Sequence, residues 1–429
     1  MLRKPGTLFV LVCGLGCGSA SAQTPLSLTL ADAEKLAIRT NPALTAQQFN
    51  AQAAAQEPLA VRSALYPTAF GSVTGVGADS GSRLAAGALN NPSVYSRFAA
   101  GVTVNQLVTD FGRTRNLAAA AGYRAQAADQ VTQSVDANIV LQTDRAYFGV
   151  LRAQSVLTVS QQTVNARKLV SDQVTELAAN KLKSDLDVSF ANVNLAQAQI
   201  QLAGAANDVR AAKAQLATAL GMPAQQDFAL ADQPMPGPVD ATVDAYLRQA
   251  IQNRPELAQL RLEVNAAERT TEAEKELRLP TINAIGTAGV VPAGEAAVAG
   301  RYGAAGVNVN IPIFNGGLFK ARRTEAELRL AAAQKNVEDL RNRVMRDVQT
   351  AWLDAMTAYE QVGLTAQLLE QARRAQDLAQ GRYDLGLSSI VELSQAQLNF
   401  ASAQIANAAA KFDFEAQLSF LQYQTGNLR

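Results

Sequence analysis

The chain has 429 residues, of which 38 are Lys or Arg, 37 are Asp or Glu and none is His, so its formal net charge is +1. Such a balance lacks the basic field that nucleic-acid binding needs, and no nucleic-acid partner is expected. The absence of His removes the commonest general base and metal ligand, and no catalytic or phosphate-binding motif stands in its place. We therefore expect no enzyme, no cofactor and no metal site.

Residues 1–22 have the pattern of a secretory signal peptide. Arg3 and Lys4 precede an apolar run that ends near Leu15, and small residues lead to Ala22. Cleavage after Ala22 would remove both cysteines and change the formal charge from +1 to −1. Lipidation at Cys17 is the alternative, although the Gly-Leu-Gly before it is a poor context. The apolar run is too short for a membrane anchor, and no apolar segment of roughly 18 residues follows it.

The rest of the chain repeats itself once. Asn41-Pro42-Ala43-Leu44 returns 213 positions later as Arg254-Pro255-Glu256-Leu257, and from about residue 107 the offset is 205, so that Gly221 matches Gly426. A period this long indicates a duplicated half-molecule rather than a solenoid unit. We divide the chain into a first repeat, a Pro-rich linker or equatorial segment, and a second repeat, at 23–221, 222–240 and 241–429.

Proline placement predicts the helices, because helix interiors exclude proline. All 14 prolines avoid residues 113–222 and 313–429, and each of these tracts is interrupted once near its middle. Apolar residues in steps of three and four indicate coiled-coil packing, and each interruption is typical of a helical hairpin turn. The predicted helices of the first repeat lie around 29–65 and at 113–180 and 185–221. Those of the second repeat lie around 241–279 and at 318–385 and 389–425.

Between the opening helix and the long helix, each repeat alternates in polarity as a two-faced strand does. This pattern predicts β-hairpins at 68–106 and 281–311, with four strands of the length found in membrane β-barrels. A half-buried sheet of a water-soluble domain has the same pattern. The export signal and the aromatic residues at the strand–helix junctions favour the membrane. Those aromatic residues are Tyr66, Phe111, Phe314 and Phe319.

Four strands cannot close a barrel, and open sheet edges are not tolerated in lipid. If the strands cross a membrane, several chains must therefore share one barrel. A dimer would supply eight strands and a filled lumen, and a trimer would supply twelve strands and room for a pore.

Together these features resemble the TolC-like outer-membrane efflux proteins of Gram-negative bacteria, over essentially the whole mature chain. The likeness rests on the Asn-Pro and Arg-Pro repeat starts, on Tyr-Pro-Thr and Leu-Pro-Thr at 66 and 279, on Ile311–Gly317 before the second long helix, and on Arg382–Leu387 at the second hairpin. It implies an α+β membrane protein. In that fold a long antiparallel α-helical coiled-coil barrel, the periplasmic tunnel, continues into a transmembrane β-barrel with 4 strands per protomer and 12 in a homotrimer.

The resemblance also implies a function. The chain would be the outer-membrane channel of a tripartite efflux pump or type I secretion system, through which small molecules or proteins are exported passively. Its partners would be a periplasmic adaptor (membrane fusion) protein, an inner-membrane transporter and outer-membrane lipid. The rival hypothesis is a soluble periplasmic coiled-coil scaffold or adaptor protein, which would explain the helices but not the strands.

By the same resemblance, the tunnel closes at the hairpin tips. Glu392 and Gln395 fall where the family has acidic residues around the entrance, and Tyr383 and Asp187 fall where a closing hydrogen bond can form. Ser388 stands where some members have Arg, so one tie between neighbouring hairpins is expected to be missing. Asp187 and Glu392 can equally be solvated carboxylates favoured by helix N-termini.

The resemblance implies that the adaptor docks on the two hairpin turns. The expected docking residues are Lys181, Leu182, Ser184, Leu385, Gly386, Leu387 and Ser388.

Overall fold

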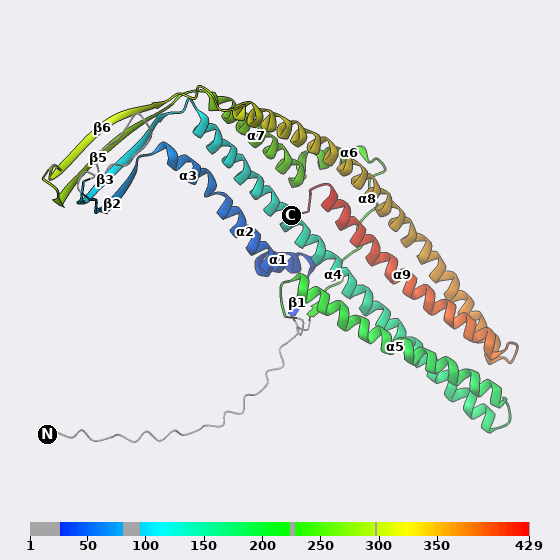
Figure 1. Cartoon of the computed structure of the whole chain (residues 1–429). Helices are drawn as coiled ribbons and strands as arrows, with labels where there is room; N and C mark the ends of the chain where they lie inside the picture. Colours follow the sequence, from blue (N-terminus) through cyan, green and yellow to red (C-terminus); the bar gives the residue numbers. More distant parts are fainter. Residues whose placement is uncertain (1–25, 80–94, 224–227, 297, 429) are drawn as a thin grey trace, which may run out of the picture.

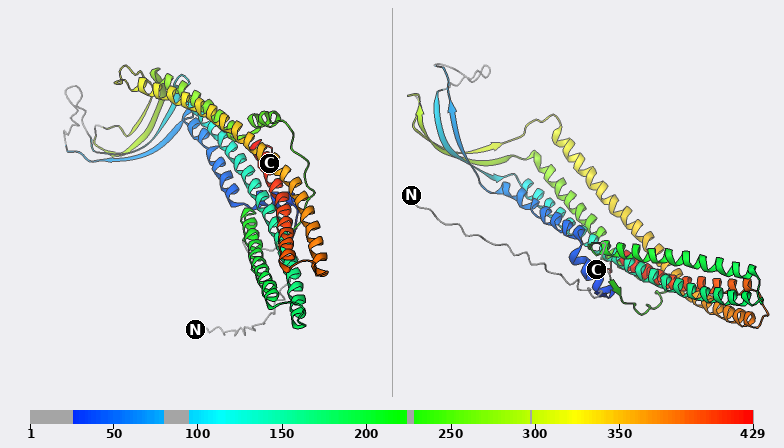
Figure 2. Two further views of the ribbon diagram at one scale, coloured as in Figure 1. Left: turned by 90° about the vertical axis from the view of Figure 1, so that its right-hand side faces the viewer. Right: turned by 90° about the horizontal axis from the view of Figure 1, so that it is seen from below.

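The computed structural model describes residues 26–79, 95–223, 228–296 and 298–428. The expected signal peptide, with Cys17, lies outside the described residues, as does the loop 80–94 of the first β-hairpin. The molecule is elongated, with a curved sheet at one end and helical hairpins at the other (Figure 1). The views of Figure 2 show the sheet bending away from the axis of the long helices.

Two helices of 67 residues each, α4 (Arg113–Ala179) and α8 (Leu318–Asp384), run through the helical part. At ~1.5 Å per residue each is about 100 Å long. The helices α5 (Asp185–Ala219) and α9 (Ile390–Gln424) fold back along their distal halves (Figure 1). Among the described residues, no helix combines the length and the apolar composition needed to cross a bilayer.

Shorter helices cover the halves of α4 and α8 that lie nearer the sheet (Figure 1). In the first repeat these are α1 (Leu30–Thr40), α2 (Pro42–Ala54), α3 (Glu57–Arg62) and the 3₁₀ turn η1 (Ser63–Leu65). In the second repeat they are α6 (Asp244–Asn253), α7 (Pro255–Lys275) and η3 (Glu276–Arg278). Each break between the first two helices precedes a proline, whose ring disfavours a helical conformation in the residue before it.

The sheet is antiparallel, with strand order β2-β3-β5-β6. Its strands are β2 (Thr68–Val76), β3 (Arg97–Thr109), β5 (Thr281–Gly294) and β6 (Arg301–Asn310). Pairing of β3 with β5 joins the hairpins of the two repeats into one sheet. Within the described chain, the outer edges of β2 and β6 pair with no other strand.

The register of the four strands gives the sheet a mostly apolar face and a more polar face. The apolar face includes Ala69, Val102, Val104, Ala284, Ala288, Ala305, Val307 and Val309. The polar face includes Thr68, Thr103, Asn105, Asn283, Thr287, Asn308 and Asn310. On the polar face, the Tyr302 ring lies over Gly101 and Gly289, where any Cβ atom would collide with it.

A close approach of two backbones recurs in both repeats. Gly221 and Gly426, just after α5 and α9, have left-handed φ values of 67° and 72°. A Cβ atom on Gly221 would lie 2.8 Å from the Cα atom of Asn41, and one on Gly426 would lie 2.8 Å from the carbonyl carbon of Asn253. The repeated glycine and the repeated helix break are therefore two sides of one contact.

A short two-stranded parallel sheet and one buried aromatic residue lie in the middle of the molecule. The strand β1 (Leu26–Leu28) pairs in parallel with β4 (Phe228–Leu230), which lies in the segment between the repeats. The buried Tyr147 hydroxyl donates to the carbonyl oxygens of Leu28 and Ala231, at 3.0 and 2.6 Å. We call this arrangement the equatorial belt.

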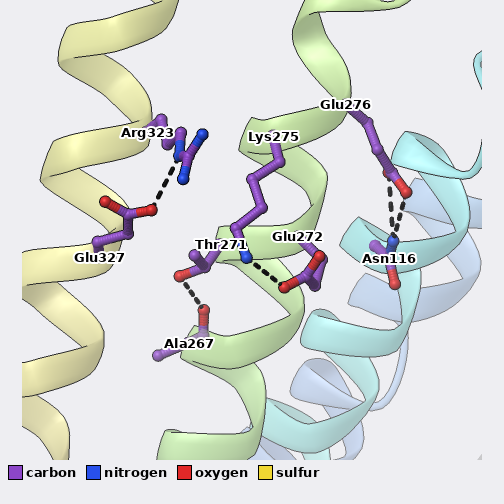
Figure 3. A network of polar contacts seen from close by, with 8 residues as sticks. All are labelled: Asn116, Ala267, Thr271, Glu272, Lys275, Glu276, Arg323 and Glu327. Carbon is purple, nitrogen blue, oxygen red and sulfur yellow. Dashed lines mark hydrogen bonds and ion pairs between the residues drawn. The ribbon is translucent and has the colours of Figure 1, made fainter.

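Near the sheet, a polar contact joins the two repeats. The Asn116 side-chain amide on α4 donates to both carboxylate oxygens of Glu276, at 3.1 and 3.2 Å (Figure 3). The other contacts drawn there stay within one helix each: Lys275 with Glu272, Thr271 with Ala267, and Arg323 with Glu327. The Asn116–Glu276 contact therefore fixes α4 against the end of α7 where the strands begin.

Candidate functional site: the helical hairpin tips

The two hairpin turns have the same backbone design. Lys181 and Gly386, 205 positions apart, take left-handed φ values of 61° and 74°. The amide of the next residue, Leu182 or Leu387, donates back to a carbonyl oxygen at the end of α4 or α8, at 2.9 or 2.8 Å. This is a Schellman-type helix end, in which glycine has no steric penalty. A lysine bears that penalty in the first hairpin.

Each turn leads into a serine N-cap. The Ser184 hydroxyl accepts from the Asp187 amide at 3.2 Å, and the Asp187 carboxylate accepts from the Ser184 amide at 3.1 Å. This capping box satisfies two amides at the start of α5. The hydrogen bonds from Ser184 lower the pKa of Asp187, with a smaller contribution from the Lys183 charge.

Glu392 occupies the position in the second hairpin that Asp187 has in the first. The Ser389 hydroxyl accepts from its amide at 3.3 Å, but the Glu392 carboxylate turns to Arg382, whose Nε lies 3.4 Å from Oε1. Both side chains are exposed, so the pair contributes at most about 1 kcal/mol. Gln395, one turn further along, donates to the Asn399 side-chain oxygen at 2.9 Å.

Tyr383 differs from the expectation. Its side chain is buried, and its hydroxyl has no hydrogen-bond partner in the described structure. Within one protomer the expected hydrogen bond to Asp187 is not formed, and the Asp187 carboxylate caps its own helix. Instead, the Lys183 ammonium lies 4.6 Å from the centre of the Tyr383 ring. Burial raises the pKa of Tyr383, and the charges of Asp187 and Asp384 raise it further.

The two hairpins are tied together by residues that the sequence analysis missed. The buried Arg167 on α4 donates to Gln397 Oε1 at 2.7 Å and to the Ser394 carbonyl oxygen at 2.9 Å, both on α9. Asn194 on α5 donates to the Ser394 hydroxyl at 3.1 Å. One signal in the sequence could have found this tie: Arg167 stands at the position that the buried Ala372 has in the second repeat.

A groove lies beside these contacts, lined by residues of α4, α5 and α9. It has a volume of about 450 Å³, and Arg167 lies among its lining residues. Phe190, Ile390 and Leu398 give it an apolar component.

The expected docking residues present leucines to solvent. Leu182, Leu385 and Leu387 are 69%, 75% and 67% exposed. Lys181 and Gly386 shape the turns and Ser184 caps α5, whereas the Ser388 hydroxyl is buried without a partner. In the described part of the chain, no group of three or more His, Cys, Asp or Glu residues is placed to hold a metal ion.

Comparison with known proteins identifies the family. The model of the outer membrane efflux protein family matches residues 34–222 and 246–426. This chain belongs to the outer membrane efflux protein family. The resemblance noted in the sequence, the α+β channel fold and the outer-membrane location are thereby confirmed. The efflux protein is a channel component, and a soluble periplasmic scaffold or adaptor does not fit this assignment.

The individual relatives of this efflux protein have low sequence identity to it, but the alignments cover most of each chain. The chain is 25% identical to the outer membrane efflux protein BepC of Brucella suis, with 76% of this chain and 72% of BepC covered. It is 24% identical to TolC of Escherichia coli, with 87% and 77% covered. Among solved structures, the outer-membrane channel OprN superposes with a TM-score of 0.80 at 18% identity, with 93% and 90% covered. That superposition supports the fold alone.

Proposed function

We propose that three copies of this efflux protein form the exit duct of a tripartite efflux pump or a type I secretion system. The observation that carries the proposal is the four-stranded sheet with two free edges and one mostly apolar face. A bilayer accepts such a sheet only if β6 of one copy pairs with β2 of the next, so that no edge remains. Three sheets then supply twelve strands around a lumen lined by the polar face.

The duct performs no chemistry in this proposal. Its helical part would extend into the periplasm as a tunnel, and transport energy would come from an inner-membrane transporter. A periplasmic adaptor would meet the duct at the hairpin tips, where Leu182, Leu385 and Leu387 are exposed. Exposed leucines beside a helical groove suit docking of an amphipathic helix.

We further propose that the tips form the entrance and restrict it. In a trimer, Asp187 and Glu392 would each occur three times around one mouth, and a ring of one charge sign selects counter-ions. The closing contacts within a protomer are then the Lys183–Tyr383 contact and the Arg167 tie. Both differ from the Tyr383–Asp187 hydrogen bond that the resemblance implied.

Planar-bilayer recordings test the entrance. Glu392→Gln is expected to lower cation preference, because it removes three carboxylates from the mouth. Tyr383→Phe is expected to leave conductance nearly unchanged, since the hydroxyl has no partner. Tyr383→Ala is expected to raise it, because the cation–π contact, worth about 0.5–2 kcal/mol per site, is lost with the ring.

Glu370→Gln is the matched control for Glu392→Gln. Glu370 also pairs with an arginine, Arg374 at 2.6 Å, but lies on α8 before the tip. Equal selectivity of Glu392→Gln and the wild type, together with equal conductance of Tyr383→Ala and the wild type, would place the restriction elsewhere.

A further inference from the structure

Two carboxyl groups meet inside the helical part, far from the hairpin tips. Asp144 on α4 is 1% exposed, and its Oδ1 atom has no hydrogen-bond partner within the described structure. The Glu34 carboxyl group on α1 and the Ser419 hydroxyl on α9 are the neighbouring side chains that act on its pKa. Two neighbouring carboxylates repel each other when both are ionised in a buried site, which favours a proton held between them.

Cations compensate this carboxyl pair only weakly in the described part of the chain. Lys35 lies next to Glu34 in the chain and lowers its pKa, but burial has the larger, opposite effect on Glu34. Arg145, next to Asp144, lies over the Phe420 ring, 4.7 Å from its centre. Among the described residues, the side chains that act on the pKa of Asp144 are thus one carboxyl group and one hydroxyl group, and neither carries a positive charge.

A third buried carboxyl group lies one turn away on α9. Glu415 is 2% exposed, and neither of its oxygen atoms has a hydrogen-bond partner in the described structure. The charges that act on it are Lys411, on the same helix, and Asp232, just after β4. These two pair with each other at 2.8 Å, which weakens the effect of Lys411 on Glu415.

The second repeat shows that the fold does not require carboxyl groups at this joint. At the repeat offsets, Glu34 corresponds to Leu247, and Asp144 corresponds to Gln349. Leu247 packs with Val344 and Val348 in an apolar cluster between α6 and α8. The first repeat therefore places two ionisable groups where an apolar and a neutral polar residue suffice.

The carboxyl pair lies beside the equatorial belt. Tyr147, one turn along α4 from Asp144, holds Leu28 of β1 and Ala231 after β4. Helix α1 follows β1 directly. Movement of α1 away from α4 would therefore pull on the belt.

We propose that a proton shared by Asp144 and Glu34 holds α1 against α4, and that its loss as the pH rises through the neutral range loosens α1 and the equatorial belt. This device is independent of the proposed duct function. It makes the middle of the molecule responsive to the pH of the compartment around it.

The direction of the pH effect follows from burial. Burial and then the Glu34 charge raise the pKa of Asp144 from 3.8 to about 8. Because the folded state holds the proton more tightly than the open state, the stabilisation is complete at low pH. It is lost progressively between about pH 4 and pH 8, and little changes above pH 8. Burial likewise raises the pKa of Glu415 to about 7, with Lys411 opposing.

Amide hydrogen exchange of α1 in the full-length, detergent-solubilised protein tests the proposal between pH 6 and 9. After correction for intrinsic exchange, the opening constant of α1 is expected to rise by up to about ten-fold per pH unit and to level off above about pH 8. In Asp144→Asn the rise should fall below about two-fold per unit, because an amide donates to Glu34 at any pH.

Two further variants keep the test decisive. Asp172→Asn alters an exposed carboxylate on the same helix and is expected to retain the wild-type pH profile. The double variant Glu34→Leu/Asp144→Gln carries the residues of the second repeat and should also be flat, whether or not Asp144→Asn folds. A flat wild-type profile, or a wild-type slope in the folded variants, would overturn the proposal.

Discussion

Gly221→Ala and Gly426→Ala are each expected to lower the stability of the helical part by about 2–5 kcal/mol. A non-glycine residue costs about 1–2 kcal/mol in the left-handed conformation. The new Cβ atom would also lie 2.8 Å from backbone atoms of the facing helix break, and overpacking of this kind costs about 1–3 kcal/mol. Backbone atoms cannot rotate away as a side chain can, so the strain has no simple release.

Gly204→Ala is the control for both variants. Gly204 lies within α5, and a Cβ atom there would meet nothing within 4 Å. Alanine in a helix interior is favoured over glycine by about 1 kcal/mol, so this variant should be as stable as the wild type or more so. The stabilities of all three variants are measured by unfolding in urea, monitored by circular dichroism. Equal midpoints for Gly221→Ala and Gly204→Ala would show that the close approach carries no strain.

Ala305→Pro is expected to abolish assembly while leaving the pairing of β5 with β6 intact. The Val291 amide donates to the Gly300 carbonyl oxygen at 2.8 Å, and this pair follows the register of β5 with β6. Inward and outward amides alternate along a strand, so the Ala305 amide points to the free edge of β6. Proline removes that donor, once in each of three junctions, and an unpaired group in lipid costs several kcal/mol.

Ala305→Ser keeps the amide and should assemble as the wild type does. The comparison is made on outer-membrane extracts, as the fraction of protein in the three-subunit species. Normal assembly of Ala305→Pro would show that β6 is not a junction between subunits.

Local signals predicted the helices and the strands, whereas pairing over long distances came only from the structure. Helix interiors exclude proline, so the proline-free tracts marked the ranges in which the long helices α4, α5, α8 and α9 lie. Alternation of apolar and polar residues marked the strands, because successive side chains of a strand point to opposite faces. The pairing of β3 with β5 joins residues almost 200 positions apart, and no local pattern specifies it.

For the site residues too, the sequence predicted the positions but not the long-range contacts. The repeat placed Asp187 and Glu392 in equivalent positions, but the partner of each depends on side-chain packing. The Asp187 carboxylate accepts from Ser184, and the Tyr383 hydroxyl has no partner in the described structure. Arg167 becomes a tie only because α9 packs over it.

The number of subunits in the particle extracted from the outer membrane tests the proposed duct most directly. Multi-angle light scattering of the detergent-solubilised protein, with the detergent mass subtracted, measures it. We predict three copies per particle, with the edges of β2 and β6 joined between neighbours. A monodisperse particle of one copy that still conducts ions in a planar bilayer would contradict the shared barrel.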